Sequence, residues 1–336
     1  MNITSAREVL DLARTVEAYI VDDDAEVWVD RLDENVSDIE LAIETLVESS
    51  DADSALDLAG ALSLFWQDIG RVDDGRRITE RLLADLDDHP RTRALARAHL
   101  VLGELAFRQG DQVVAAAATT TAGEIAAELK DDWIIGRAEL NLARVAFRDG
   151  EAPRIFEHAE RVLDVAGDNS RLRSGAIHML AWAEYSAGNL SAAIKRFEEN
   201  VALYQESGDR IGVASEFGNL GDLAVESGDL DAAASYLGRA LAVRGAADNR
   251  YLSPSLIRSV GALAVLQGRH DLGLELIAAS ERLYEEFGLI GDPGDDLTPR
   301  AKKTAVEAVG AEAGAIELRG RERSFEDAVA LAIKSV

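Results

Sequence analysis

Six glycines at nearly constant spacing constrain the fold of this chain more than any other feature. The intervals between them are 40, 40, 38, 40 and 40 residues, and each glycine separates two apolar stretches of helical period. A register this regular indicates one helix–turn–helix unit copied in series. Glycine suits such turns because the connecting residue takes a positive φ, which penalises a Cβ. The glycines are Gly70, Gly110, Gly150, Gly188, Gly228 and Gly268.

The clearest copy of the unit runs from residue 214 to residue 243 and resembles the tetratricopeptide repeat. Small residues at Gly221, Ala233 and Ala240 allow two helices to approach closely, while large residues such as Phe217 and Leu237 fill the space between pairs. No stretch alternates with period two, so no sheet is expected. The predicted fold is all-α, a right-handed superhelical solenoid of tetratricopeptide-like helix pairs with a period of about 40 residues, longer than the usual one of about 34.

Three regions are predicted along the chain. Residues 1–50 form an N-terminal helical cap with helices over 4–20 and 24–49, residues 51–290 form six helix pairs, and residues 291–336 form a C-terminal helical cap. In the last region we expect one helix near 299–315 and a final helix from Phe325, which Ser324 and Asp327 begin in the manner of a capping box.

Composition and motifs argue against several classes of protein. The chain has no cysteine and five dispersed histidines, and neither a zinc-protease motif nor a phosphate-binding loop occurs. The sequence therefore predicts no enzyme activity, no cofactor and no metal. The acidic clusters at 22–24 and 292–296 are interpreted as a solvated surface and a turn, because Val27 stands where a calcium loop requires glycine.

Charge and hydropathy limit the possible partners and the compartment. A net charge of −27 opposes direct binding of nucleic acid or of an anionic membrane. Residues 1–60 carry 17 acidic side chains and three basic ones, which is typical of a solvated, repulsive surface. Because the chain shows neither a secretion signal nor an apolar run of membrane-spanning length, a cytoplasmic protein is expected.

Three segments go beyond the generic repeat: Trp28–Ile43, Ala55–Leu62 with Phe65 to Arg77, and Ser324–Ile333. Together they resemble the C-terminal helical-repeat region of actinobacterial STAND-class regulatory ATPases, including LuxR-type regulators. The resemblance implies a region that senses an effector or partner, either as a separate module or as part of a larger chain. ATPase and transcription-factor activity are not implied, since the phosphate-binding loop and a basic recognition helix are missing.

Candidate binding residues follow from the repeat register. In stacked helix pairs the first helix of each pair lines the concave face, at positions 2, 3, 6, 9, 10 and 13 before the turn glycine. There the sequence places arginines among aromatic side chains, a pattern suited to carboxylate or phosphate groups. The candidates are Arg97, Arg108, Arg137, Asn141, Arg144, Arg148, His178, Trp182, Tyr185 and Asn219.

Several functions are compatible with this pattern. The first is a protein- or peptide-binding scaffold or sensor module of a bacterial regulatory system, whose partner carries an anionic group such as a C-terminal carboxylate. The second is a receptor for a sugar or a small anionic effector; sugar recognition would favour exposed Trp182 and Tyr185, with Asn141 and Asn219 lining one pocket. The simplest alternative is purely structural: Phe107 and Phe147 pack between repeats, and Arg108 and Arg148 cap helix ends. An enzyme would require converging titratable groups in a closed pocket.

Overall fold

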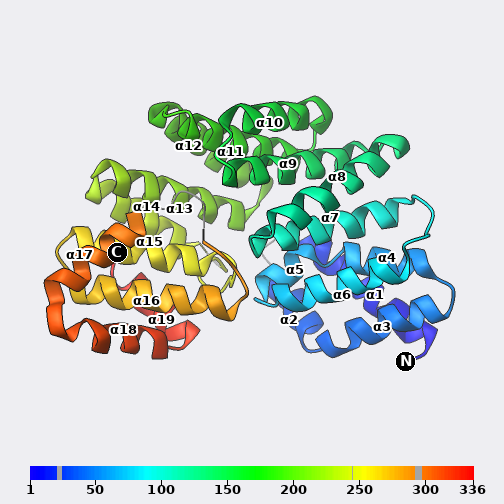
Figure 1. Ribbon diagram of the computed structural model, residues 1–336, viewed down its shortest axis with the longest axis horizontal. Coiled ribbons are helices and arrows are strands. Elements are labelled where there is room, and N and C mark those ends of the chain that lie inside the picture. Colours follow the sequence, from blue (N-terminus) through cyan, green and yellow to red (C-terminus); the bar gives the residue numbers. More distant parts are fainter. Residues whose placement is uncertain (21–24, 244, 292–296) are drawn as a thin grey trace. The chain divides into compact units, whose positions relative to one another are not determined.

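The computed structural model describes residues 1–20, 25–243, 245–291 and 297–336, and in these ranges the chain is helical without any β-strand (Figure 1). The predicted all-α class, built from helix pairs, is therefore confirmed. The chain divides into two compact units, Met1–Ala187 (unit 1) and Gly188–Val336 (unit 2). The acidic clusters at 22–24 and 292–296 lie outside the described residues.

In unit 1 each helix from α6 to α11 packs on the next one in the chain, while α1 packs on both α2 and α3 and α4 packs on α7 (Figure 1). Helix α9 also contacts both α7 and α11, so the first helices of successive pairs form one continuous face, here called the first-helix face. The helices of unit 1 are α1 (Ile3–Tyr19), α2 (Ala25–Asp33), α3 (Val36–Glu48), α4 (Ala52–Gly60), α5 (Ser63–Asp68), α6 (Val72–Asp85), α7 (Arg93–Arg108), α8 (Gln112–Leu129), α9 (Asp132–Arg148), α10 (Ala152–Ala166) and α11 (Ser170–Ser186).

Unit 2 continues the pattern and ends in shorter helices. The predicted start of the last helix is confirmed, since the Ser324 hydroxyl oxygen accepts a hydrogen bond from the Asp327 amide at 3.1 Å. The helices of unit 2 are α12 (Leu190–Ser207), α13 (Arg210–Ser227), α14 (Leu230–Ala242), α15 (Ser253–Leu266), α16 (His270–Glu286), α17 (Leu297–Val309), a 3₁₀ turn (Gly310–Glu312), α18 (Ala313–Glu322) and α19 (Phe325–Ile333).

The turn glycines adopt the backbone conformation that the sequence predicts. All six have a positive φ, from 68° at Gly70 to 82° at Gly188. An aspartate after the glycine then caps the second helix in two of the turns: Asp111 accepts from the Val114 amide at 3.1 Å, and Asp229 accepts from the Ala232 amide at 3.0 Å. Each such turn reverses the chain in very few residues.

Small residues bring the two helices of a pair together, as in α13 and α14. A Cβ added to Gly221 would lie only 2.7 Å from the Leu237 side chain, and Ala233 and Ala240 are completely buried. At that separation the Leu237 side chain fills the space above the glycine. Burying a leucine in this way contributes roughly 1.5–3 kcal/mol.

Three predicted helices are broken in the structure. The helix expected over 24–49 is interrupted at residues 34–35, because the Asn35 side chain donates to the Arg31 carbonyl at 2.8 Å and replaces a backbone hydrogen bond. The helix expected near 299–315 ends at Val309, before Gly310 takes a φ of 60°, and α18 follows. The first helix of the first pair is divided into α4 and α5.

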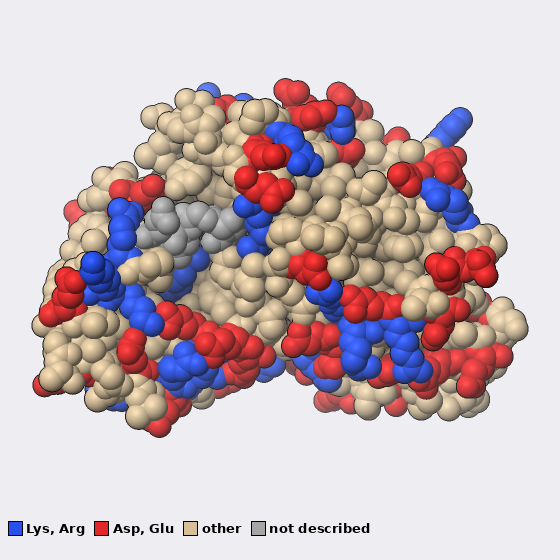
Figure 2. Space-filling view, viewed as in Figure 1, with Lys and Arg blue, Asp and Glu red and all other residues tan. Residues whose placement is uncertain are grey.

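Surface charges of opposite sign are paired over α3 and α6. Arg77 and Arg81 on α6 reach Glu40 on α3 at 3.0 Å each, and Arg81 also reaches Glu44 at 2.6 Å. In Figure 2 basic and acidic side chains alternate on the visible face over these helices. This part of the acidic N-terminal region is therefore a solvated ion-pair network, each pair of which stabilises by at most about 1 kcal/mol.

The turn assignment predicts opposite effects of alanine at two glycines of unit 2. Gly228→Ala should lower the free energy of unfolding by about 1–2 kcal/mol, because φ is 81° there and nothing else lies within 4 Å of the new Cβ. Gly314→Ala, at the exposed second residue of α18, should raise it by about 0.4–1 kcal/mol, because alanine restricts the unfolded chain more than glycine does. Urea unfolding of both variants measures the two signs, and an unchanged midpoint for Gly228→Ala would contradict the assignment.

Candidate functional site

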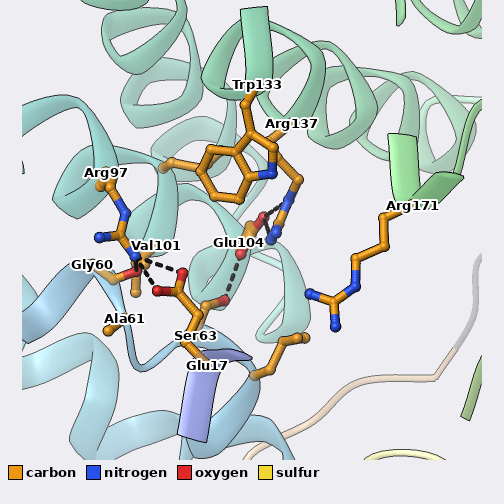
Figure 3. Close-up of a pocket in the computed structure, with 12 residues that line it drawn as sticks. Glu17, Gly60, Ala61, Ser63, Arg97, Val101, Glu104, Trp133, Arg137 and Arg171 are labelled. Atoms are coloured by element: carbon orange, nitrogen blue, oxygen red, sulfur yellow. Dashed lines mark hydrogen bonds and ion pairs between the residues drawn. The ribbon is translucent and has the colours of Figure 1, made fainter. Parts of the chain in front are cut away.

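A cleft in unit 1 lies among α1, α4, α5, α7, α9 and α11 and encloses about 430 Å³, a volume that includes space open to solvent (Figure 3). Its walls combine apolar groups, one tryptophan and charged side chains of both signs. The lining residues are Glu17, Gly60, Ala61, Ser63, Leu64, Arg97, Leu100, Val101, Glu104, Trp133, Arg137 and Arg171.

The repeat register explains which residues of α7 and α9 reach this cleft. Arg97, Leu100, Val101 and Glu104 stand 13, 10, 9 and 6 residues before Gly110, and Arg137 stands 13 residues before Gly150. These intervals bring side chains to one stripe of a helix. The cleft therefore opens on the first-helix face.

Arg97 lies at the base of the cleft with both terminal nitrogens of its guanidinium engaged by carboxylates of α1 and α4. One terminal nitrogen donates to both Glu17 oxygens at 2.5 and 2.6 Å and to the Gly60 carbonyl at 3.1 Å, and the other pairs with Asp57. Asp57 is also bound by Arg14 at 2.6 and 2.9 Å. A Cβ on Gly60 would lie 2.8 Å from the Arg97 Cβ, so glycine permits this approach at the break between α4 and α5.

Glu104 is a buried carboxylate that joins α5, α7 and α9. It accepts a hydrogen bond from the Ser63 hydroxyl at 2.5 Å and pairs with Arg137, whose Nε lies at 3.2 Å. Burial alone would raise the pKa of this carboxyl, but the charge of Arg137, the Ser63 hydrogen bond and the charge of Arg144 outweigh burial and lower the pKa of Glu104. Glu104 is therefore ionised at neutral pH.

Trp133 and Arg171 form the outer wall of the cleft. The Trp133 ring has the Arg93 and Arg137 guanidinium carbons at 5.8 and 5.4 Å from its centroid, within the range of cation–π attraction. The Arg171 guanidinium is exposed and extends from α11 toward the cleft (Figure 3). Within the described ranges no hydrogen-bond or ion-pair partner is found for Arg171.

The structure brings some of the ten predicted residues to the cleft and places others elsewhere. Arg97 and Arg137 line it, and Arg144 is close enough to influence Glu104. Asn141 is completely buried and donates to the Thr119 hydroxyl at 2.7 Å, so it is a contact between α8 and α9. Asn219 belongs to unit 2, where it donates to the buried Glu216 at 3.0 Å.

The remaining predicted residues surround aromatic rings at the turn ends of the first helices. Arg108 and Arg148 lie 5.4 and 4.6 Å from the Phe107 centroid, and Arg108 donates to Gln67. Phe107 is 5% exposed and belongs to the core between α7, α8 and α9. This is the position that the purely structural alternative predicts for Phe107. A second, half-buried group packs beside it on α9 and α11: the Trp182 indole donates to His178 at 3.1 Å and contacts Phe147 and Tyr185.

Sequence reasoning missed Trp133 and Arg171, although the signal was present. Arg93, Trp133 and Arg171 each stand 17 residues before a turn glycine, one helical turn beyond the last position considered. Glu17 and Ser63 had no comparable signal, because Glu17 comes from a helix before the repeats and Ser63, 7 residues before Gly70, stands at none of the positions considered.

Two further features, a metal-binding cluster and a membrane-spanning helix, are absent from the described residues. Among the described residues, no group of three or more histidine, aspartate and glutamate side chains is arranged to hold a metal ion. Within the same ranges, none of the helices combines the length and the apolar character needed to cross a membrane.

Comparison with known proteins identifies the fold. No protein-family model matches this chain, and no curated protein matches it either. A Rap protein solved in complex with competence and sporulation factor is similar with a TM-score of 0.61 and 12% identity, over 98% of this chain and 96% of that one. Aspartyl phosphate phosphatase F from Bacillus subtilis is similar with a TM-score of 0.57 and 13% identity, over 96% and 94%. This chain thus shares the helical-repeat fold of these proteins.

The ionised, buried Glu104 predicts a pH-dependent effect of its removal. Glu104→Gln should lower the free energy of unfolding by about 1–3 kcal/mol at pH 7, because Arg137 and Ser63 lose a charged partner. Because the folded-state pKa of Glu104 is lowered, its ionised carboxylate stabilises the folded protein fully at pH values above the ordinary pKa of 4.5. This contribution to the free energy of unfolding disappears as the pH falls through the folded-state pKa.

The difference between wild type and Glu104→Gln should therefore shrink as the pH falls well below 4.5, as measured by urea unfolding across the acid range. Glu128→Gln is the matched control, since its pair with Arg91 is exposed and should matter by less than about 1 kcal/mol. A difference that stays constant with pH would contradict the ionised state of Glu104.

Proposed function

We propose that this chain is a non-catalytic binding module of a bacterial regulatory system, which captures a peptide or a protein segment on the first-helix face of unit 1. The cleft around Arg97, Trp133 and Arg171 supports this proposal, because its lining combines apolar side chains with polar groups that can orient a chain. The shared fold adds support, since one Rap protein of this fold was solved with a bound factor.

The single observation that carries the proposal is the charge of Arg171, which has no ion-pair partner among the described residues. Each carboxylate around the cleft has an arginine of its own: Glu17 has Arg97, Asp57 also has Arg14, and Glu104 has Arg137. Arg171 is the remaining cation, and it stands at the mouth beside Trp133. In a chain of net charge −27, a local surplus of positive charge favours an anionic group on the ligand.

A peptide with a free carboxylate beside an apolar side chain matches this arrangement. The Arg171 guanidinium offers a planar fork to the carboxylate. Leu64, Leu100 and Val101 line the apolar part of the same cleft. Trp133 adds rigid contact area of the kind that dominates binding energy at interfaces.

Catalysis is disfavoured by the chemistry of Glu104. Ser63 and Glu104 are the one nucleophile–carboxylate pair in the lining of the cleft. A general base acts best with a pKa near the working pH, whereas Arg137 and Ser63 help to lower the pKa of Glu104. The pair therefore serves as a structural contact between helices. Sugar binding has no supporting observation, since Asn141 is completely buried.

The proposal predicts that Arg171 controls binding of short peptides with a free C-terminal carboxylate. A pool of fluorescent synthetic peptides, each made as the free acid and as the amide, is titrated against the full chain in low salt. Arg171→Ala should weaken binding of the free-acid peptides by about tenfold, because it removes one charge-assisted contact. A contact worth about 1.4 kcal/mol corresponds to a factor of ten in Kd.

The matched control is Arg173→Ala, which removes the same charge two residues away on α11. The exposed Arg173 side chain reaches only the Gly167 carbonyl at 3.4 Å, and residues two apart do not share a helix face. If no peptide in either form binds the wild type, or if both variants behave alike, the proposed function is wrong.

A further inference from the structure

Glu17 places one of the chain's own carboxylates in the cleft. Both of its oxygens accept from a single Arg97 nitrogen, at 2.5 and 2.6 Å (Figure 3). Arg97 is the only hydrogen-bonding partner of Glu17 among the described residues. The Glu17 side chain is 32% exposed, whereas the Arg97 side chain is 7% exposed. A solvent-accessible carboxylate is thus held by a buried guanidinium.

The local sequence does not favour a glutamate at this position of α1. Glu17 lies in the last turn of the helix, which ends at Tyr19. A negative charge near a helix C-terminus interacts unfavourably with the helix dipole. The contact with Arg97 offsets this local cost and keeps the Glu17 carboxylate in the cleft.

Asp57, the other carboxylate on Arg97, is held quite differently. It is 18% exposed and also accepts from Arg14 through two nitrogens at 2.6 and 2.9 Å. Asp57 would therefore lose two cations if it left. Glu17 has one partner and can be hydrated easily, so it is the exchangeable carboxylate of the two.

We infer that Glu17 is an intramolecular competitor, which occupies an anion subsite on Arg97 and lowers the affinity of the cleft for a ligand carboxylate. The inference rests on the proposed function in one respect, namely that the ligand enters this cleft. A tethered group acts at an effective concentration of about millimolar or more, so an external carboxylate must displace it from Arg97. Arg97 then has two carboxylate partners both before and after displacement: Asp57 with Glu17 in the free protein, and Asp57 with the ligand carboxylate in the complex.

The test is the affinity of the Glu17→Gln variant for the same free-acid peptides. Glutamine keeps the shape of the side chain and removes its charge, so these peptides should bind about tenfold more tightly than to the wild type. Glu8→Gln is the matched control, because Glu8 is exposed on the same helix and has no partner among the described residues. It changes the net charge equally and should leave the affinity unchanged.

The outcomes separate this inference from the proposed function. If free-acid peptides bind the wild type and Glu17→Gln binds them no more tightly, the inference is wrong and the proposed function stands. If no peptide binds any of these proteins, both are wrong. Tighter binding of these peptides to Glu17→Gln than to the wild type, with the affinity of Glu8→Gln unchanged, would support both.

A second variant guards against a folding defect in the first. Glu17→Asp keeps the charge and withdraws the carboxylate by one methylene group, so its affinity should fall between those of the wild type and Glu17→Gln. Thermal unfolding of each variant shows which proteins are folded. An affinity of Glu17→Asp equal to or below that of the wild type would also overturn the inference.

Discussion

The arrangement of unit 1 depends on arginines that reach back from one helix pair to the preceding one. Arg97 and Arg137 are exactly one repeat apart in the register, and each pairs with a carboxylate of an earlier helix: Asp57 on α4 and Glu104 on α7. Buried ion pairs add little net stability, because desolvation opposes the attraction. Breaking one leaves an unpaired charge, however, and this penalty favours the observed neighbours over other packings of similar amphipathic helices.

The same pairing explains how an acidic protein can contain an arginine-rich face without a large positive patch. Carboxylates of α1, α4 and α7 neutralise Arg97 and Arg137 inside the unit, and other arginines pack against aromatic rings. The face is therefore rich in arginine but carries little free charge. An external ligand can therefore recognise mainly the few charged side chains that are not paired inside the unit.

The sequence predicted the parts of the structure that depend on local backbone chemistry. Turn glycines have a positive φ wherever they occur, so their spacing was enough to find the helix pairs. The break at Asn35 was missed because a side chain replaced a single backbone hydrogen bond there. At the site, the register contains Arg97, Arg137 and the Glu104 partner of Arg137, but the Glu17 partner of Arg97 was not predictable, because Glu17 lies 80 residues before Arg97 and outside any repeat.

The cleft lies at the step of the array where the repeated positions of arginine and carboxylate are occupied by other residues. The position of Arg97 and Arg137 is taken in α11 by Gly175, where a Cβ would lie 2.7 Å from Leu140 and no arginine fits. The arginine of α11 that reaches the cleft, Arg171, stands one turn earlier. In α9, moreover, Arg144 replaces the carboxylate that α7 carries as Glu104. Among the described residues Arg171 therefore has no carboxylate acceptor on the preceding first helix, and its charge stays available at this step, whereas Arg97 and Arg137 are neutralised within the unit.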